Sequence, residues 1–249
     1  MLPQAHSARH AGDRAACVNE RKSMNMLYLV RHGENTANLT REFSHRAVDY
    51  SLTPKGVLQA RQTAEHFRHR RVDAIYSSPL KRALETAQII GQAVGREPQV
   101  LEEFREVNVG VLESWPPTNE SWAEHDRIIR AWLTDRPDLL FPGGENYHML
   151  LGRMRAGVAE VLRGRRNEHV IVVGHGGIFT FTLKDMCRDI DLRTLMSQPS
   201  RNCSITEIEV LEDADAHEPR GTLRSWSSYA HLSGEALPHI IGHPAYDDR

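Results

Sequence analysis

The sequence has few cysteines, and none of them are paired in a CxxC spacing. Cys17, Cys187 and Cys203 are odd in number and widely separated. Small secreted proteins that depend on disulfides usually carry an even, closely spaced set. We therefore predict no disulfide framework and expect the three thiols to be reduced.

Long apolar runs and a strong charge imbalance are also absent. No apolar run approaches the ~20 residues that span a membrane, and the first residues, MLPQAHSARHAGDR, lack the apolar core of a secretory signal. The formal net charge of −2 argues against a broad nucleic-acid surface, which needs clustered basic residues. We predict a cytoplasmic protein that binds neither nucleic acid nor membrane.

What remains is an ordinary soluble composition, with 40% hydrophobic and 26% charged residues among 249. No interior tract resembles a linker, which favours one large domain. We place this domain at residues 26–232. Residues 1–25 are polar and aperiodic and are predicted to be a flexible extension, and residues 233–249 form a tail that contains proline and histidine.

Apolar runs and helical patterns alternate along the domain. Strands are predicted at residues 27–30, 72–77, 99–101, 170–173, 204–211 and 222–228. Helices are predicted to begin at Pro54 behind an N-cap threonine, to open at Ser78-Pro79, and to span residues 118–134, 146–163 and 178–186. This alternation predicts an α/β fold with a mainly parallel sheet covered on both faces.

Two predicted strands end in a histidine beside glycine. The stretch LYLVRHGENTAN places Arg31 and His32 at the end of the first strand, and VIVVGHGG places His175 and Gly176 after a later strand. Parallel strands present their carboxyl ends on one edge, so these side chains can converge there. Arg82 follows another strand at the start of a helix, where anions bind. The sequence therefore predicts an anion site at this edge.

Transfer of a phosphoryl group from an ester to a histidine requires a proton for the departing alkoxide. A carboxyl group with a raised pKa can supply that proton near neutral pH. The segment LEEFREVNVG offers Glu102, Glu103 and Glu106, and their position alone does not choose among them.

The chain resembles the histidine phosphatase superfamily, which contains cofactor-dependent phosphoglycerate mutases and broad phosphomonoesterases. The resemblance runs from Leu27 to about Leu232 and is carried by the ordered motifs RHGENTAN, LTPKGVLQA, SSPLKRALETA, EVNVG, PGGEN and VVGHGG. It implies a three-layer α/β/α sandwich of the phosphoglycerate mutase type. It also implies that no metal or other cofactor is needed, and that a homodimer is possible.

Each motif position then carries an implied role. By resemblance, His32 is the nucleophile that becomes phosphorylated, and Arg31, Arg82 and His175 hold the phosphoryl oxygens. Glu106 matches the proton donor because of its interval before a glycine. Asn38 matches a polar residue that contacts the phosphoryl group, and Gly176 allows the backbone to approach it closely. The ring nitrogen of His32 that does not attack should donate to a nearby backbone carbonyl.

Two positions near the predicted site depart from the common pattern. Asn35 stands where serine or threonine is usual, and an amide can still donate to phosphate. Ser44 is followed by His45 where mutases usually have glycine, so His45 is a candidate substrate contact, although an exposed loop histidine is the simpler interpretation.

Glu106 and His175 are 69 positions apart, the shorter arrangement typical of the phosphatase branch. We predict hydrolysis of a small phosphorylated metabolite. The alternatives are a cofactor-dependent phosphoglycerate mutase and a non-catalytic relative that binds phosphate. Substrate choice is expected to come from residues 40–50 and 111–141, the least family-like parts.

Overall fold

The structure is a computed structural model that describes residues 24–238 apart from 189, 191–194, 196 and 212–220. Almost all of the predicted N-terminal extension and most of the predicted tail, residues 239–249, lie outside the described residues, as does Cys17. The first strand begins at Met24, two residues before the predicted domain boundary. The first residues of the predicted tail form a short 3-10 helix, η3 (Gly234–Ala236), whose Ala236 carbonyl accepts a hydrogen bond from Gln59 Nε2 at 3.1 Å.

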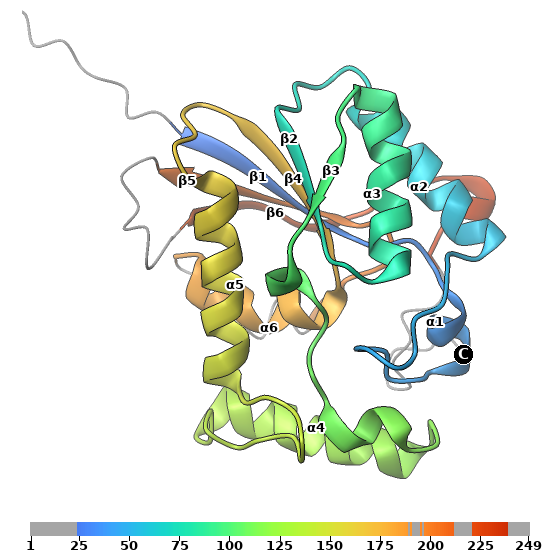
Figure 1. Cartoon of the computed structure of the whole chain (residues 1–249), viewed down its shortest axis with the longest axis vertical. Coiled ribbons are helices and arrows are strands. Elements are labelled where there is room, and N and C mark those ends of the chain that lie inside the picture. Colours follow the sequence, from blue (N-terminus) through green and yellow to red (C-terminus); the bar gives the residue numbers. More distant parts are fainter. Residues whose placement is uncertain (1–23, 189, 191–194, 196, 212–220, 239–249) are drawn as a thin grey trace, which may run out of the picture.

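Six strands form one twisted sheet in the order β3-β2-β4-β1-β5-β6 (Figure 1). Their bounds are Met24–Arg31 (β1), Ala74–Ser77 (β2), Pro98–Val100 (β3), His169–Gly174 (β4), Ile205–Leu211 (β5) and Gly221–Ser228 (β6). The first four strands pair in parallel, and β5 and β6 add an antiparallel edge beyond β1. The predicted mainly parallel α/β sheet is confirmed.

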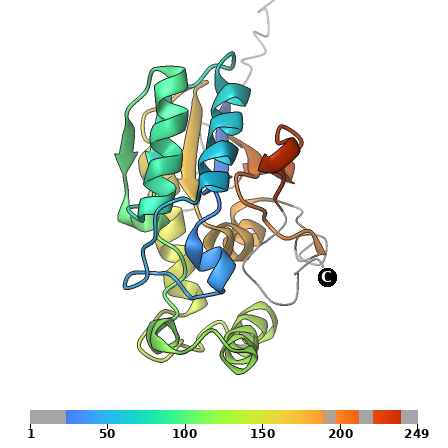
Figure 2. The same ribbon diagram turned by 90° about the vertical axis from the view of Figure 1, so that its right-hand side faces the viewer.

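The central strands are apolar on both faces because helices cover both. In β1, Leu27 and Leu29 face the core beneath α5 (Tyr147–Leu162) and α6 (Gly176–Met186). Tyr28 and Val30 face the opposite core, beneath α2 (Pro54–Phe67) and α3 (Lys81–Val94). Side chains alternate along a strand, so a strand with both faces buried reads as one continuous apolar run. Figures 1 and 2 show the resulting helix, sheet and helix layers.

Local signals place most helix ends near the predicted positions. Thr53 Oγ1 accepts a hydrogen bond from Gly56 N at 3.0 Å and Pro54 follows, so α2 begins as expected. The helix expected to open at Ser78-Pro79 begins instead at Lys81, after the extended N-cap residue Leu80. A five-residue helix, α1 (Thr36–Thr40), was not predicted, since it is too short for a periodic apolar pattern.

One helix, α4 (Asn119–Thr134), lies outside both helical layers, at the end of the molecule where α1 also lies (Figures 1 and 2). Its buried face is built around Ile128, Ile129 and Trp132. Among the described residues, no helix combines the length and the apolar character that crossing a membrane requires.

Candidate active site

Strand register brings the two predicted histidines together. Because Arg31 pairs with Gly174 across the parallel β1 and β4, the residues that follow, His32 and His175, leave the sheet side by side. Their ring centroids are 5.2 Å apart. Both side chains are buried, with at most 3% of the residue surface exposed.

Hydrogen bonds fix the tautomer of His32. Arg82 Nε lies 3.1 Å from His32 Nε2, and a guanidinium can only donate, so Nε2 must be the accepting nitrogen. Nδ1 therefore carries the hydrogen and donates to the Gly33 carbonyl at 2.7 Å. Burial, followed by the charges of Arg82 and Arg31, lowers the pKa of His32 well below its ordinary value of 6.5. His32 is thus neutral and presents a lone pair on Nε2, as a nucleophile requires.

His175, unlike His32, does not line the pocket described below. Its Nε2 is 2.7 Å from Ser78 Oγ, and its buried Nδ1 has no hydrogen-bond partner among the described residues. Burial, then the charges of Arg82 and His32, lowers the pKa of His175 well below its ordinary value. The imidazole is consequently neutral before an anion binds.

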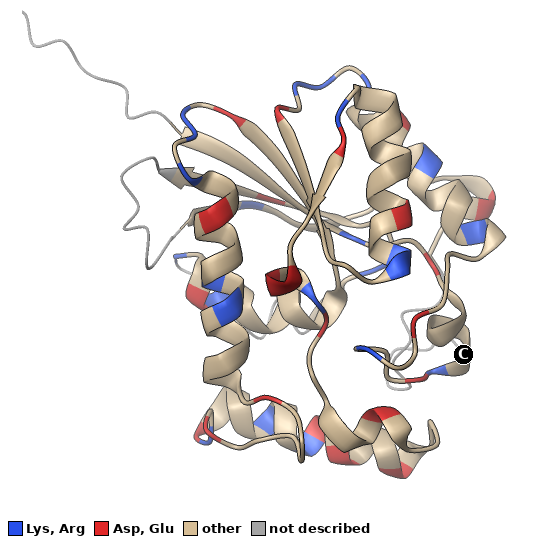
Figure 3. Cartoon of the chain, viewed as in Figure 1, with Lys and Arg blue, Asp and Glu red and all other residues tan. Residues whose placement is uncertain are grey.

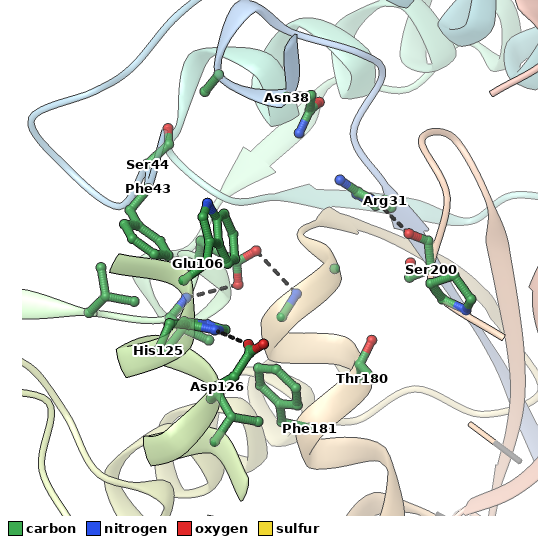
Figure 4. A pocket seen from close by; sticks show the side chains of 18 of the residues that line it. Arg31, Asn38, Phe43, Ser44, Glu106, His125, Asp126, Thr180, Phe181 and Ser200 are labelled. Carbon is green, nitrogen blue, oxygen red and sulfur yellow. Dashed lines mark hydrogen bonds and ion pairs between the residues drawn. The ribbon is translucent and has the colours of Figure 1, made fainter. Parts of the chain in front are cut away.

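Arg31 and Arg82 bring two buried guanidinium groups to the same pocket. Arg31 Nη1 donates to the Ser200 carbonyl, as Figure 4 shows, and both arginines line the pocket. Arg82 Nη1 and Nη2 donate to the hydroxyl and the carbonyl of Ser44, each at 2.8 Å. Burial lowers the pKa of each arginine to about 10, so both remain charged at neutral pH. Figure 3 shows the basic start of α3 near this end of the sheet.

Of the three candidate acids, only Glu106 lines the pocket among the described residues. Its carboxylate accepts backbone hydrogen bonds from Val107 at 2.8 Å and from Gly177 at 3.1 Å (Figure 4). It also accepts one from Ile178 at 2.9 Å. The last two donors belong to the first turn of α6, so the carboxylate also meets the positive end of that helix. Glu102 instead forms an exposed ion pair with Arg105.

A glycine makes this position of the acid possible. A Cβ added at Gly177 would lie 2.6 Å from Glu106 Oε1, closer than real Cβ atoms come to any heavy atom. The glycine-rich end of VVGHGG therefore leaves the space that the carboxylate occupies.

The loop that carries Glu106 is fixed from behind by Arg153 of α5. Arg153 Nη2 donates to the Glu106 carbonyl at 3.0 Å, and Nη1 donates to the Arg105 carbonyl at 2.6 Å. The same guanidinium binds the buried Glu145 carboxylate through Nε at 3.0 Å and Nη2 at 2.8 Å. Glu145 belongs to the PGGEN motif, so this motif positions the acid indirectly, without lining the pocket.

Three asparagines lie near the end of the pocket that Arg31 and His32 line. Asn35 and Asn38 cap α1 reciprocally, each backbone N–H donating to the other's side-chain oxygen at 3.2 Å. Asn202 Nδ2 donates to the His32 carbonyl and to Asn38 Oδ1, both at 3.1 Å. Asn35 Nδ2 is buried, and no hydrogen-bond partner for it occurs among the described residues. Asn35 and Asn38 both line the pocket and can donate to an anion.

Not all of the predicted substrate-binding residues line the pocket. Ser44 and Gly176 line the pocket, whereas His45 does not. The His45 ring is directed to the Glu106 carbonyl, which lies 2.8 Å from Nδ1, and its backbone N–H donates to Glu113 at 2.6 Å. In this geometry His45 supports the loop that bears the acid.

The pocket has a volume of about 440 Å³ and extends from these polar groups toward α4. The sequence analysis placed Ser78 in a motif at a helix start but gave it no role, and it did not single out Ser200 or Asn202. These residues bind His175, Arg31 and His32, and no local signal in the sequence indicates such contacts. It did place segments 40–50 and 111–141 near the substrate, and both contribute lining residues. Among the described residues, no group of three or more His, Cys, Asp or Glu side chains is placed to hold a metal ion.

A sequence model of the family described as histidine phosphatase superfamily (branch 1) matches residues 27–218. The chain belongs to the histidine phosphatase superfamily. The resemblance seen in the sequence is thereby confirmed, and the match spans most of the domain predicted at residues 26–232.

Two relatives of this histidine phosphatase carry different activity names. The Hydrogenobacter thermophilus protein named "Putative phosphoserine phosphatase 2" is 32% identical over 190 residues, covering 75% of this chain and 90% of the relative. The Salmonella choleraesuis protein named "Probable phosphoglycerate mutase GpmB" is 33% identical over 197 residues, covering 76% and 86%.

Solved structures agree with the family fold. A phosphoserine phosphatase from Entamoeba histolytica, in complex with 3-phosphoglyceric acid, superposes with a TM-score of 0.65 at 25% identity and covers 84% of this chain and 100% of its own. A mycobacterial glucosyl-3-phosphoglycerate phosphatase superposes with a TM-score of 0.67, covering 82% and 99%. At 24% identity the second likeness concerns the fold alone.

Proposed function

We propose that this histidine phosphatase hydrolyses phosphomonoesters through a phosphohistidine at Nε2 of His32, without a metal ion. The observation that carries the proposal is the fixed tautomer of His32. Its Nε2 accepts a hydrogen bond from the buried Arg82, and the buried Arg31 and Glu106 line the same pocket. The nucleophile, the cationic groups and the acid are thus within one site.

In the first half-reaction, His32 Nε2 attacks phosphorus in line, and an N–P bond forms as the P–O ester bond breaks. Arg31, Arg82 and the polar groups around them stabilise the negative charge on the phosphoryl oxygens. The departing alkoxide takes a proton from the Glu106 carboxyl. The backbone donors around Glu106 position this carboxyl, and also suit the carboxylate that is left after the transfer.

In the second half-reaction, water attacks the phosphoryl group and the N–P bond breaks. The Glu106 carboxylate accepts a proton from the water, and His32 regains its Nε2 lone pair as phosphate forms. Proton transfer returns Glu106 to its starting state, so one water is consumed for each ester. Two fixed guanidinium groups supply the positive charge, and the proposal therefore requires no metal ion.

The substrate is proposed to be a small phosphorylated metabolite. The names of the relatives point to phosphoserine and to phosphoglycerates, which are starting compounds for an assay panel. The mutase name favours a second candidate function, transfer of the phosphoryl group back to a phosphoglycerate. Interconversion of 2- and 3-phosphoglycerate without release of phosphate would support the mutase over the hydrolase.

The proposal is tested by release of p-nitrophenol from p-nitrophenyl phosphate in the presence of EDTA. We expect the wild-type chain to be active and His32→Ala to lose all measurable turnover. His69→Ala removes an exposed histidine outside the pocket and serves as the matched control. Full activity of His32→Ala, with unchanged thermal unfolding, would falsify the assignment of the nucleophile.

A further inference from the structure

The pocket continues well beyond the groups assigned to the phosphate. Its volume of about 440 Å³ falls within the ~300–1,000 Å³ typical of sites for small organic molecules. The phosphate end is formed by Arg31, His32 and Arg82, and the remainder lies beneath α4. A compact alcohol would therefore leave most of this volume unfilled.

Apolar and aromatic side chains line the part of the pocket beneath α4. Figure 4 shows Phe43, from the loop after α1, and Phe181, on α6, among the lining side chains. Trp122 joins Phe43 with ring centroids 4.4 Å apart, and its Nε1 donates to the Arg41 carbonyl at 3.0 Å, which fixes the indole. Ile129, Leu133, Val107 and Val109 extend the same lining. This apolar chamber, as we call the part of the pocket lined by Phe43, Trp122, Ile129, Leu133 and Phe181, suits a ring or branched hydrocarbon.

The charged residues that line the pocket near the apolar chamber do not favour an anionic substituent on the substrate. Asp126 and Glu42 are acidic, and Asp126 Oδ1 is 2.9 Å from Nδ1 of the buried His125 (Figure 4). The one arginine among the described lining residues away from the phosphate end is Arg130, whose side chain is exposed. A carboxylate entering the chamber would lose water without gaining a buried cation, which is unfavourable.

We propose that the preferred substrate is the phosphomonoester of a bulky, uncharged alcohol with an aromatic or branched apolar group. The apolar chamber binds that group while the phosphate end performs the chemistry, so Trp122, Leu133 and Phe181 are specificity-determining residues. This inference rests on the proposed hydrolase function, and it ranks such esters above phosphoserine and phosphoglycerate.

The test uses three esters whose leaving alcohols have similar intrinsic reactivity: ethyl phosphate, 2-phenylethyl phosphate and 3-phosphooxypropanoate. Ethyl phosphate has no substituent to place in the apolar chamber. 2-Phenylethyl phosphate places a phenyl group there, and 3-phosphooxypropanoate places a carboxylate. We expect kcat/KM for 2-phenylethyl phosphate to exceed that for each of the other two at least ~10-fold, because apolar pockets discriminate by about this factor or more. Equal values for ethyl and 2-phenylethyl phosphate would overturn the inference and leave hydrolysis intact.

Binding of the matching phosphonates separates this inference from the proposed function. Phosphonates are not hydrolysed, so their affinities, measured by calorimetry, report on the pocket even if the chain releases no phosphate. Tighter binding of 2-phenylethylphosphonate than of ethylphosphonate by at least ~10-fold supports the apolar chamber. Equal affinities contradict it, whatever the turnover assays show.

Two variants and a control assign the effect to the chamber. Trp122→Ala is expected to lower the preference for phenylethyl over ethyl several-fold, and Leu133→Arg to shift the preference toward the carboxylate ester by adding a cation. Arg127→Ala, on the exposed face of the same helix, should leave both ratios unchanged. Suppose that Leu133→Arg has the same unfolding temperature as the wild-type protein. If its ratio of kcat/KM for 3-phosphooxypropanoate to that for ethyl phosphate is then also unchanged, the assignment of the chamber is wrong.

Discussion

The two ends of the pocket are built in different ways. The phosphate end consists of charged and polar side chains whose positions follow from strand ends and helix starts, and most are hydrogen-bonded to backbone atoms. The apolar chamber depends on α4 and on the loop after α1, which meet through ring contacts between residues about 80 positions apart, such as Phe43 and Trp122. We therefore propose that chemistry and substrate choice belong to separable parts of the molecule.

This separation predicts that changes at the phosphate end reduce turnover for every ester, whereas changes in the apolar chamber alter the ranking of esters. A rigid, backbone-bonded site tolerates little displacement of the reacting groups. An apolar surface made by side chains of a helix outside the main layers can change more freely. The predictions below test this contrast, beginning with the largest expected effect.

Replacement of the acid should reduce turnover the most among these variants. Glu106→Gln keeps the size of the side chain but cannot supply a proton, so kcat is expected to fall about 10²–10⁴-fold, equally for all esters. Steady-state kinetics with ethyl and 2-phenylethyl phosphate measure both the loss and its uniformity. Glu103→Gln, a nearby carboxylate outside the pocket, is the control. A loss confined to one ester would contradict the separation of chemistry from substrate choice.

A methyl group at Gly177 should displace the same acid without removing it. The Cβ of Gly177→Ala would lie 2.6 Å from Glu106 Oε1, so the carboxylate must move. A displacement of about 1 Å can reduce the rate up to ~10²-fold, and we expect kcat to fall by about 10-fold to that limit. Gly152→Ala is the matched control, since a Cβ there has no heavy atom within 4 Å. Wild-type kcat in Gly177→Ala would mean that the position of Glu106 is unimportant.

The contrast also explains what the sequence could and could not predict. The strand that ends in Arg31 and the strand that ends before His175 could be predicted because apolar runs followed by glycine-flanked polar residues are local signals. Their proximity follows from a general rule about parallel sheets. Even the donor role of the second nitrogen of His32 was predicted, and the bond to the Gly33 carbonyl confirms it.

The apolar chamber and the hydrogen bonds that support the site could not be predicted from local sequence signals. Trp122 lies on the amphipathic α4 and Phe181 on the apolar α6, and on such helices an aromatic residue is ordinarily interpreted as part of the core. The pocket that both residues line depends on how α4 packs against the rest of the fold. Asn202 reaches the His32 carbonyl across 170 positions. Contacts of that range depend on tertiary packing, for which the sequence offers no local signal.

The loop between the two ends offers a smaller perturbation. Glu113 Oε1 accepts the backbone N–H groups of His45, Arg46, Ala47 and Val48 at 2.6–3.3 Å, and these bonds, against the opposing effect of burial, lower the pKa of Glu113. The loop begins at Ser44, the partner of Arg82. Loss of charge-assisted bonds of this kind costs about 1.5–3 kcal/mol.

We therefore expect Glu113→Ala to reduce the free energy of unfolding by about that amount and to raise KM for all esters several-fold. Chemical denaturation and steady-state kinetics measure the two effects. Glu120→Ala, an exposed glutamate at the start of α4, is the control for stability. An altered ranking of esters with unchanged KM for ethyl phosphate would instead assign this loop to the apolar chamber.

The smallest expected effect concerns protonation of the two histidines at the phosphate end. Burial and the arginines lower the pKa of His32 and His175 in the folded protein below 6.5, whereas in the unfolded chain both keep that ordinary value. On acidification below about pH 6.5 the unfolded chain therefore binds protons first, and stability falls as the pH falls. In the folded protein, NMR signals of these two rings should stay flat between about pH 8 and pH 6.

Phosphate should change that titration, because an anion beside His175 opposes the positive charges that lower its pKa. Binding of sulfate, a stand-in for phosphate that stays a dianion across this pH range and has no proton of its own to release, is then expected to take up protons, measured by calorimetry in buffers of different ionisation enthalpy. An apolar alcohol such as 2-phenylethanol, which would enter only the chamber, should bind without proton uptake. Equal proton uptake for both ligands would show that the two ends of the pocket are electrostatically one site.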